Sequence, residues 1–148
     1  MTSTLALKLV SSYEGRAKES REYQQNLLEE RRLLETAGPK RWQELRDCFR
    51  ETIAEVNVKL NSDMLQWHDT PDQNSIKISR RGTGLFVNGV FESVTRTLTI
   101  TGPNDYDVMT YEQKVLGDDV QFVTTRQTEN LPQTSDQIVE KALGKLLY

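Results

Sequence analysis

The chain has 148 residues, of which 36% are hydrophobic and 28% are charged, and its formal net charge at pH 7 is −3. This length is typical of a single domain with its own core, and the composition lies outside the range of intrinsically disordered chains. The negative net charge argues against the broad basic surface of a nucleic-acid-binding protein.

The first predicted element is a long helix over residues 5–36. Gly15 is its only glycine, it contains no proline, and it is rich in the helix formers Glu, Arg, Gln and Leu. One face recurs at alternating steps of four and three residues, although only about half of its members are apolar: Tyr13, Ala17, Ser20, Gln24, Leu27, Arg31 and Leu34. Only about two heptads of this pattern are clean, whereas a coiled coil needs three or four clean heptads. We therefore expect either a solvated helix that packs at its two ends, through leucines such as Leu7 and Leu9 early on, or a helix that binds another protein or a second copy.

Gly38-Pro39 predicts the end of this helix and the start of a second one over residues 39–61. The second helix has an apolar stripe at steps of three and four residues, formed by Trp42, Leu45, Phe49, Ile53, Val56 and Leu60. This stripe is the clearest core signal in the chain. A short linker makes the two helices neighbours in an antiparallel hairpin.

Residues 64–126 are predicted to form a sheet of four or five strands. Apolar and polar residues alternate over 76–80 and 94–100, and Asn88-Gly89 predicts a hairpin turn because both residues tolerate positive φ. Residues 66–75 and 127–133 contain prolines and are predicted to be loops. Short turns without intervening helices imply an antiparallel meander, with one face on the helices and the other facing water or a partner.

A closing helix is predicted over residues 135–147. Thr134-Ser135-Asp136-Gln137 matches a capping box, with Thr134 as the N-cap. The helix is apolar on one side and is expected to dock on the core. The expected fold is therefore one α+β domain over residues 1–148: a helical hairpin on an antiparallel meander, followed by a short C-terminal helix.

The residue inventory restricts the available chemistry. Cys48 is the only cysteine and His68 the only histidine, which excludes an intrachain disulfide and argues against zinc sites built from cysteine and histidine. The apolar stretch at residues 5–7 is too short for a signal peptide, and no segment approaches the roughly 20 apolar residues of a membrane span. We therefore expect a cytoplasmic protein that uses no metal or cofactor.

No motif in the sequence identifies an enzyme. The residues that would contact a ligand, should a pocket bring them together, are Trp67, His68, Arg80 and Arg96. The segment 80–84 lacks the Gly-Lys-Ser/Thr ending of a phosphate-binding loop. Four acidic residues lie near predicted turns without the spacing of a calcium-binding loop: Asp105, Asp107, Asp118 and Asp119.

Three functions remain open. The leading hypothesis is a non-catalytic intracellular binding or assembly module that acts through its long N-terminal helix or its sheet face. The alternative is a small-molecule-binding protein or enzyme with a cavity between sheet and helices, lined by Trp42, Phe49, Trp67, Phe86, Tyr106 and Phe122. The third is nucleic-acid binding on the sheet face, against the net charge, through Lys77, Arg80, Arg96 and Arg126.

Overall fold

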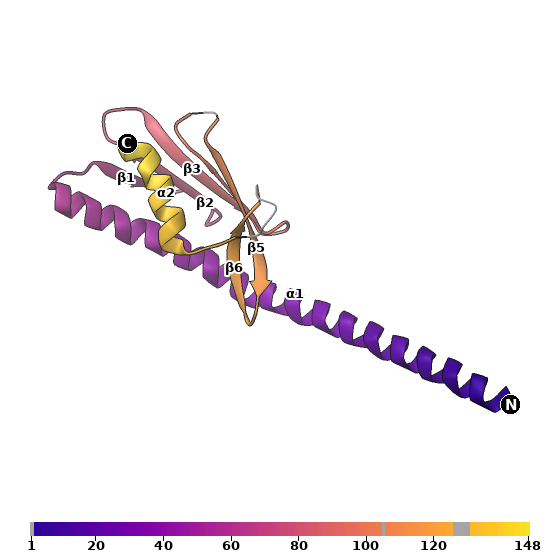
Figure 1. The fold of residues 1–148 in the computed structure, drawn as a ribbon. Coiled ribbons are helices and arrows are strands. Elements are labelled where there is room, and N and C mark those ends of the chain that lie inside the picture. The colour runs from indigo at the N-terminus through magenta and orange to yellow at the C-terminus, as the bar shows by residue number, and fades with distance from the viewer. Residues whose placement is uncertain (1, 105, 126–130) are drawn as a thin grey trace.

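The fold combines one very long helix, one sheet and one short helix. The computed structural model describes residues 2–104, 106–125 and 131–148. Helix α1 spans Thr2–Leu60 and helix α2 spans Ser135–Leu147. The strands between them are β1 (Leu65–His68), β2 (Ser75–Arg80), β3 (Leu85–Glu92), β4 (Thr97–Thr101), β5 (Val108–Leu116), β6 (Asp119–Thr124) and β7 (Pro132–Gln133). Both helices lie on the same side of the sheet, and about half of α1 extends beyond it (Figure 1).

The strands form a single antiparallel sheet in the order β1 to β7, so the predicted meander is confirmed. The predicted count of four or five strands is wrong, because β1 and β7 lie in segments that we expected to be loops. Both are edge strands of four and two residues. Pairing with β2 and β6 defines them, and such distant pairing leaves little trace in so short a stretch of sequence.

The predicted helical hairpin is also wrong, because α1 continues through Gly38 and Pro39. Pro39 has no amide hydrogen for the carbonyl of Glu35, and an interior proline usually kinks or ends a helix. Two side chains from the sheet region bond to neighbouring helix carbonyls: Arg96 Nη1 donates to the Leu34 carbonyl at 2.8 Å, and Gln113 Nε2 donates to the Gly38 carbonyl at 2.9 Å. These two hydrogen bonds fasten the helix to the sheet on both sides of the gap.

Gly38 serves close packing and does not end the helix. A Cβ atom at this position would lie 2.6 Å from Gln113 Oε1, which is closer than side-chain atoms can approach. Gln113 itself is buried on β5. The glycine that we interpreted as a helix end therefore marks the point where the helix crosses closest to the sheet.

Asn88-Gly89 does not form a turn, since both residues lie inside β3. Gly89 pairs with Ile76 on one side and Ile100 on the other, and a Cβ atom there would contact both isoleucines at 3.5–3.7 Å. The chain turns instead at residues 93–96, where Arg96 has φ +57°. Tolerance of positive φ permits a turn at Asn-Gly but does not require one when strand pairing competes for the residues.

The core lies between the sheet and the two helices, as the apolar stripe predicts. Trp42, Leu45, Phe49 and Ile53 are buried against the inward-facing residues of the strands. Helix α2 adds five buried residues, and the capping box at Thr134 and Gln137 is confirmed. In the described residues no helix is both long enough and apolar enough to cross a membrane.

Candidate protein-binding surface

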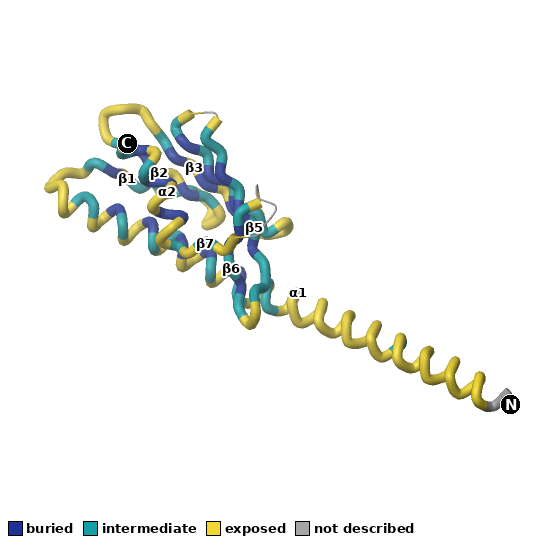
Figure 2. The backbone as a smooth tube through the Cα atoms, in the orientation of Figure 1, coloured by how far each residue is buried: buried dark blue, intermediate teal, exposed yellow. Residues whose placement is uncertain are grey.

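The projecting part of α1, which we call the arm, comprises residues 4–32. Every side chain in it is exposed except that of Ala17, which is partly buried (Figure 2). At 1.5 Å per residue these 29 residues form a rod of about 43 Å. The packed half of α1 provides the nucleus from which the arm extends, and the arm's Glu, Arg, Gln and Leu content favours that extension.

The arm exposes large apolar side chains that a solvated helix would normally lack. Leu9, Tyr13 and Leu27 are 62%, 74% and 46% exposed. Our expectation that the early leucines pack on the domain is therefore wrong, because the helix does not turn back at Gly38 and carries them away from the sheet. Scattered surface leucines are ordinary, but a contiguous apolar patch indicates an interaction site.

The arm's stripe is a continuation of the core-facing stripe. The steps of three and four residues run from Tyr13 to Leu34 and then on through Gly38 to Leu45, without a change of helix face. In the packed half this face is covered by the sheet. In the arm the same face is open (Figures 1 and 2).

The base of the arm is held by charged contacts as well as by the two hydrogen bonds around Pro39. Arg41 donates from Nε to the Val120 carbonyl at 3.0 Å and forms ion pairs with Asp119 and Glu44. The carboxylates of Glu44 and Asp119 raise the pKa of the Arg41 guanidinium. These contacts fix the direction in which the arm leaves the domain.

A groove lies where the arm leaves the sheet. It has a volume of about 620 Å³ and lies between the helix and the β3–β4 turn, with the lining residues Gln24, Leu27, Leu28, Glu30, Arg31, Leu34, Glu35, Val94 and Arg96. Val94 is 93% exposed at its rim. The sequence analysis missed this groove because it predicted a β-hairpin turn at Asn88-Gly89 and a strand over residues 94–100, which placed Val94 inside a strand.

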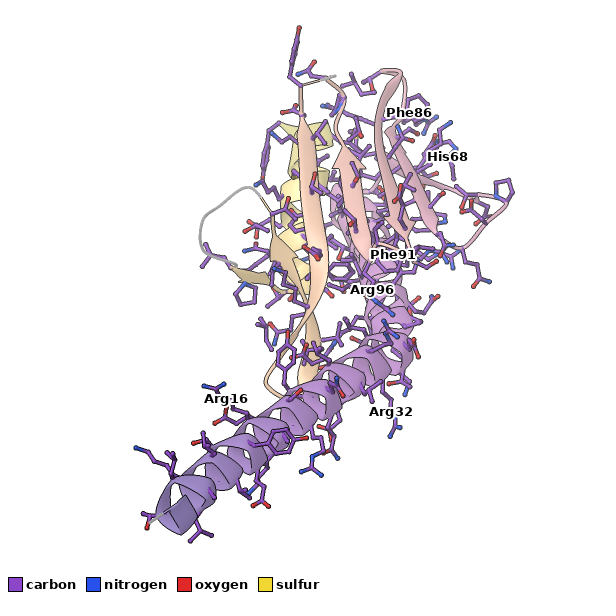
Figure 3. The ribbon with its side chains drawn as sticks, turned by 90° about the vertical axis from the view of Figure 1, so that its right-hand side faces the viewer. Arg16, Arg32, His68, Phe86, Phe91 and Arg96 are labelled. Atoms are coloured by element: carbon purple, nitrogen blue, oxygen red, sulfur yellow. The ribbon has the colours of Figure 1, made fainter. Side chains whose placement is uncertain are left out.

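The charges of the helix are divided along its length. Residues 4–21 contain four basic and two acidic residues, whereas residues 22–35 contain two basic and four acidic residues. Arg16 lies in the basic part and Arg32 in the acidic part (Figure 3). The overall charge of the exposed helix is therefore close to zero, with a positive and a negative end.

The four ligand-contact candidates do not meet at one site. His68 lies on the outer face of the sheet, where its Nε2 is 2.7 Å from Ser79 Oγ and its ring is near Phe86 (Figure 3). Trp67 faces the other way, and the guanidinium of Arg50 is 5.0 Å from the centre of its ring.

Arg80 and Arg96 both fasten helices to the sheet. Arg80 Nη1 donates to the Leu146 carbonyl at 3.2 Å, at the end of α2. Arg96 bonds Leu34 and also lines the groove. Of the four candidates, only Arg96 lines the groove beside the arm.

The basic residues considered for nucleic acid are also dispersed. Lys77 lies on the outer face of β2, with its Nζ 4.8 Å from the centre of the Phe86 ring. Arg80 and Arg96 donate to helix carbonyls, and Arg126 lies outside the described residues. The described members therefore do not form one basic face.

The cysteine and two of the acidic residues considered for catalysis or metal binding form local contacts. Burial and a hydrogen bond to Asp136 raise the pKa of the Cys48 thiol, which makes it a poor nucleophile at neutral pH. Asp107 pairs with Lys145 at 3.1 Å and Asp119 with Arg41, while Asp105 lies outside the described residues. Within the described residues, no three His, Cys, Asp or Glu side chains are grouped as a metal site.

The aromatic residues proposed to line a cavity are divided among three places. Trp42, Phe49 and Phe122 are buried in the core. Phe86 lies on the outer face, opposite Ser79, and Tyr106 is exposed. These side chains do not surround a common space.

No family model matches the chain, and comparisons with curated proteins and with solved structures gave no match either.

Proposed function

We propose that this protein is a non-catalytic, cytoplasmic assembly module whose arm is the attachment surface for another protein helix. The observation that carries the proposal is the open stripe, which continues the core-facing stripe of α1 into an arm about 43 Å long. A second helix laid along this face would cover the apolar side chains as the sheet covers those of the packed half. Helices commonly bind partners through such a stripe.

The mixed apolar and polar composition of the stripe favours a face that binds a partner reversibly and not one that is always buried. Three small or polar residues, Ala17, Ser20 and Gln24, separate Tyr13 from Leu27 along the stripe, so the arm can face water when it is unbound. An interface of this kind is apolar at its centre and polar at its rim. The anchored base adds to this, because an arm with a fixed direction loses less freedom on binding.

The test compares two substitutions on adjacent residues of the arm. Leu27→Asp places a charge on the stripe, whereas Asn26→Asp places the same charge on the outward side of the helix. The sizes of complexes containing each variant would be measured by sedimentation, both for purified protein and in extracts of the cells that produce it naturally.

We expect the unmodified chain and Asn26→Asp to form complexes heavier than the 17.0 kDa monomer, and Leu27→Asp to remain monomeric with an unchanged urea-unfolding midpoint. The proposal fails if the unmodified chain is monomeric both when purified and in extracts, or if Leu27→Asp forms the same complexes.

A further inference from the structure

We infer that the partner of the arm is a second copy of this chain, bound in antiparallel orientation, with the first turns of each arm seated in the other copy's groove. This inference rests on the proposed function and specifies its partner. Three observations support it: the heptad positions of the charges, the location of the groove, and the position of the sheet on the same face of α1.

The stripe has a heptad pattern when it is followed through the whole arm. The a positions are Val10, Ala17, Gln24 and Arg31, and the d positions are Ala6, Tyr13, Ser20, Leu27 and Leu34. Small residues at the centre, Ala17 and Ser20, allow two helices to approach closely there. Each end of the arm carries larger apolar residues.

The flanking charges favour antiparallel over parallel pairing. In a parallel pair, residues at g face residues at e five positions later in the partner. Arg16 would then face Arg21, and Glu30 would face Glu35, each twice by symmetry. All four contacts would join like charges, and Arg31 would also meet its own copy at the seam.

Antiparallel pairing removes these repulsions. When Ala17 of one copy faces Ser20 of the other, Glu14 lies next to Arg21 of the second copy, and the reverse contact also forms. Arg16 then lies next to Tyr23 of the other arm and Glu30 next to Leu9, so the like-charge contacts of the parallel pair do not form. Such flanking charge pairs set the orientation of coiled coils.

The same register places the apolar N-terminal turns of each arm in the groove of the other copy. Val10 of one copy faces Leu27 of the other, and Leu7 lies next to Leu28. Leu27 and Leu28 line the groove together with the exposed Val94. The second helix would therefore lie between the arm and the β3–β4 turn, so that the leucines on more than one side of residues 5–10 are covered.

The position of the sheet independently selects the antiparallel arrangement. The open stripe and the sheet-covered stripe are on one face of α1. Two parallel arms joined by this face would bring both sheets into the same space just beyond residue 33. Two antiparallel arms place the domains at opposite ends of the pair, and each helix ends at the other copy's sheet.

Disulfide trapping would measure the orientation. Two differently tagged chains carry Cys48→Ser, to remove the native thiol, with either Val10→Cys or Leu27→Cys. We expect a disulfide between the two different chains after mixing and mild oxidation, and no disulfide between two Val10→Cys chains. A Val10→Cys homodimer as the main product would overturn the inference, because it indicates parallel pairing.

Sedimentation of matched variants would measure how much the stripe and the groove each contribute to the affinity of the dimer. We expect the purified chain to dimerise, with Val10→Asp and Val94→Asp weakening the dimer tenfold or more. The controls are Ser11→Asp, on the outward side of the arm, and Val58→Asp, an exposed valine at the other end of α1; both are expected to stay within about twofold of the unmodified chain.

A purified chain that stays monomeric at hundreds of micromolar would also overturn the inference. If Leu27-dependent complexes still form in cell extracts, the partner is another protein and the proposed function stands. If no complex forms in either setting, the proposed function fails with it.

Discussion

The two halves of α1 differ in what covers the same helix face. Over residues 33–60 the face carries Trp42, Leu45, Phe49 and Ile53, and the sheet buries all four. Over residues 4–32 the face carries smaller and more polar residues, and it is open. A stripe with a large apolar residue at every position thus belongs to the domain's own core. A stripe with the same spacing, in which small and polar residues occupy some of the positions, indicates a surface for reversible binding.

Shortening a large side chain in each half should separate the two roles most strongly. Phe49→Ala is expected to lower the free energy of unfolding by about 3–5 kcal/mol, because Phe49 is fully buried. Leu27→Ala, in the arm, is expected to change it by less than about 0.5 kcal/mol in dilute protein. Urea unfolding followed by circular dichroism measures both. A loss of several kcal/mol for Leu27→Ala would mean that the arm belongs to the domain core.

The two glycines of α1 offer the next comparison. Gly38→Ala is expected to destabilise the domain by about 1–3 kcal/mol, because its methyl group would push against the buried Gln113. Gly15→Ala meets no atom within 4 Å and should increase the helical signal of the arm through a propensity gain of roughly 1 kcal/mol. Circular dichroism and urea unfolding would check the pair. Stabilisation by Gly38→Ala would show that the close approach to Gln113 is not needed.

Arg96 tests the junction between the halves. Arg96→Ala removes the donor to the Leu34 carbonyl and should lower the free energy of unfolding by about 1 kcal/mol, the usual value of one hydrogen bond. Arg96→Gly removes the same donor but relieves the backbone at φ +57°, so its loss should be smaller. Equal losses in urea unfolding would indicate that the backbone at this turn is unstrained.

The smallest expected effect is a pH dependence that comes from Tyr111 in the buried core. Burial raises the pKa of Tyr111, so the folded protein holds this proton to higher pH than the unfolded chain does. The contribution of Tyr111 to the free energy of unfolding should therefore be constant up to the unfolded phenol's pKa of about 10 and fall above it. Urea unfolding at about pH 8 and about pH 11, in a Cys48→Ser background, measures the slope. Tyr111→Phe should flatten it, and a slope that persists in this variant would assign it to other groups.

Much of the fold could be predicted from the sequence because its signals are local. The stripe from Trp42 to Ile53, the capping box at Thr134 and the antiparallel meander all follow from periodicity and turn length. Gly38-Pro39 and Asn88-Gly89 led to wrong predictions, a helix end and a hairpin turn. Each pair permits such a break, but contacts with distant parts of the chain keep the helix and the strand continuous. Arg96 and Gln113, the donors that bond to the helix on either side of the Glu35 carbonyl, lie more than 60 residues away along the chain.

The candidate surface was visible only in part. The stripe from Tyr13 to Leu34 is present in the sequence, and the possibility of a helix–helix contact follows from it. Its openness depends on the continuity of α1 at Pro39, which the sequence argues against. The groove depends on where the β3–β4 turn lies. A single valine at residue 94 does not predict an exposed turn, because valine is also typical of strands.

Hydrogen–deuterium exchange at two protein concentrations tests the central claim, that the arm is an open surface for association and not part of the domain core. In dilute protein, amides of residues 5–32 should exchange rapidly while those of residues 42–53 stay protected, since only the second set lies in the packed half. In concentrated protein the arm should become protected as the arms pair. Strong arm protection that is the same at both concentrations would contradict the account, because the arm would then be stabilised within a single chain.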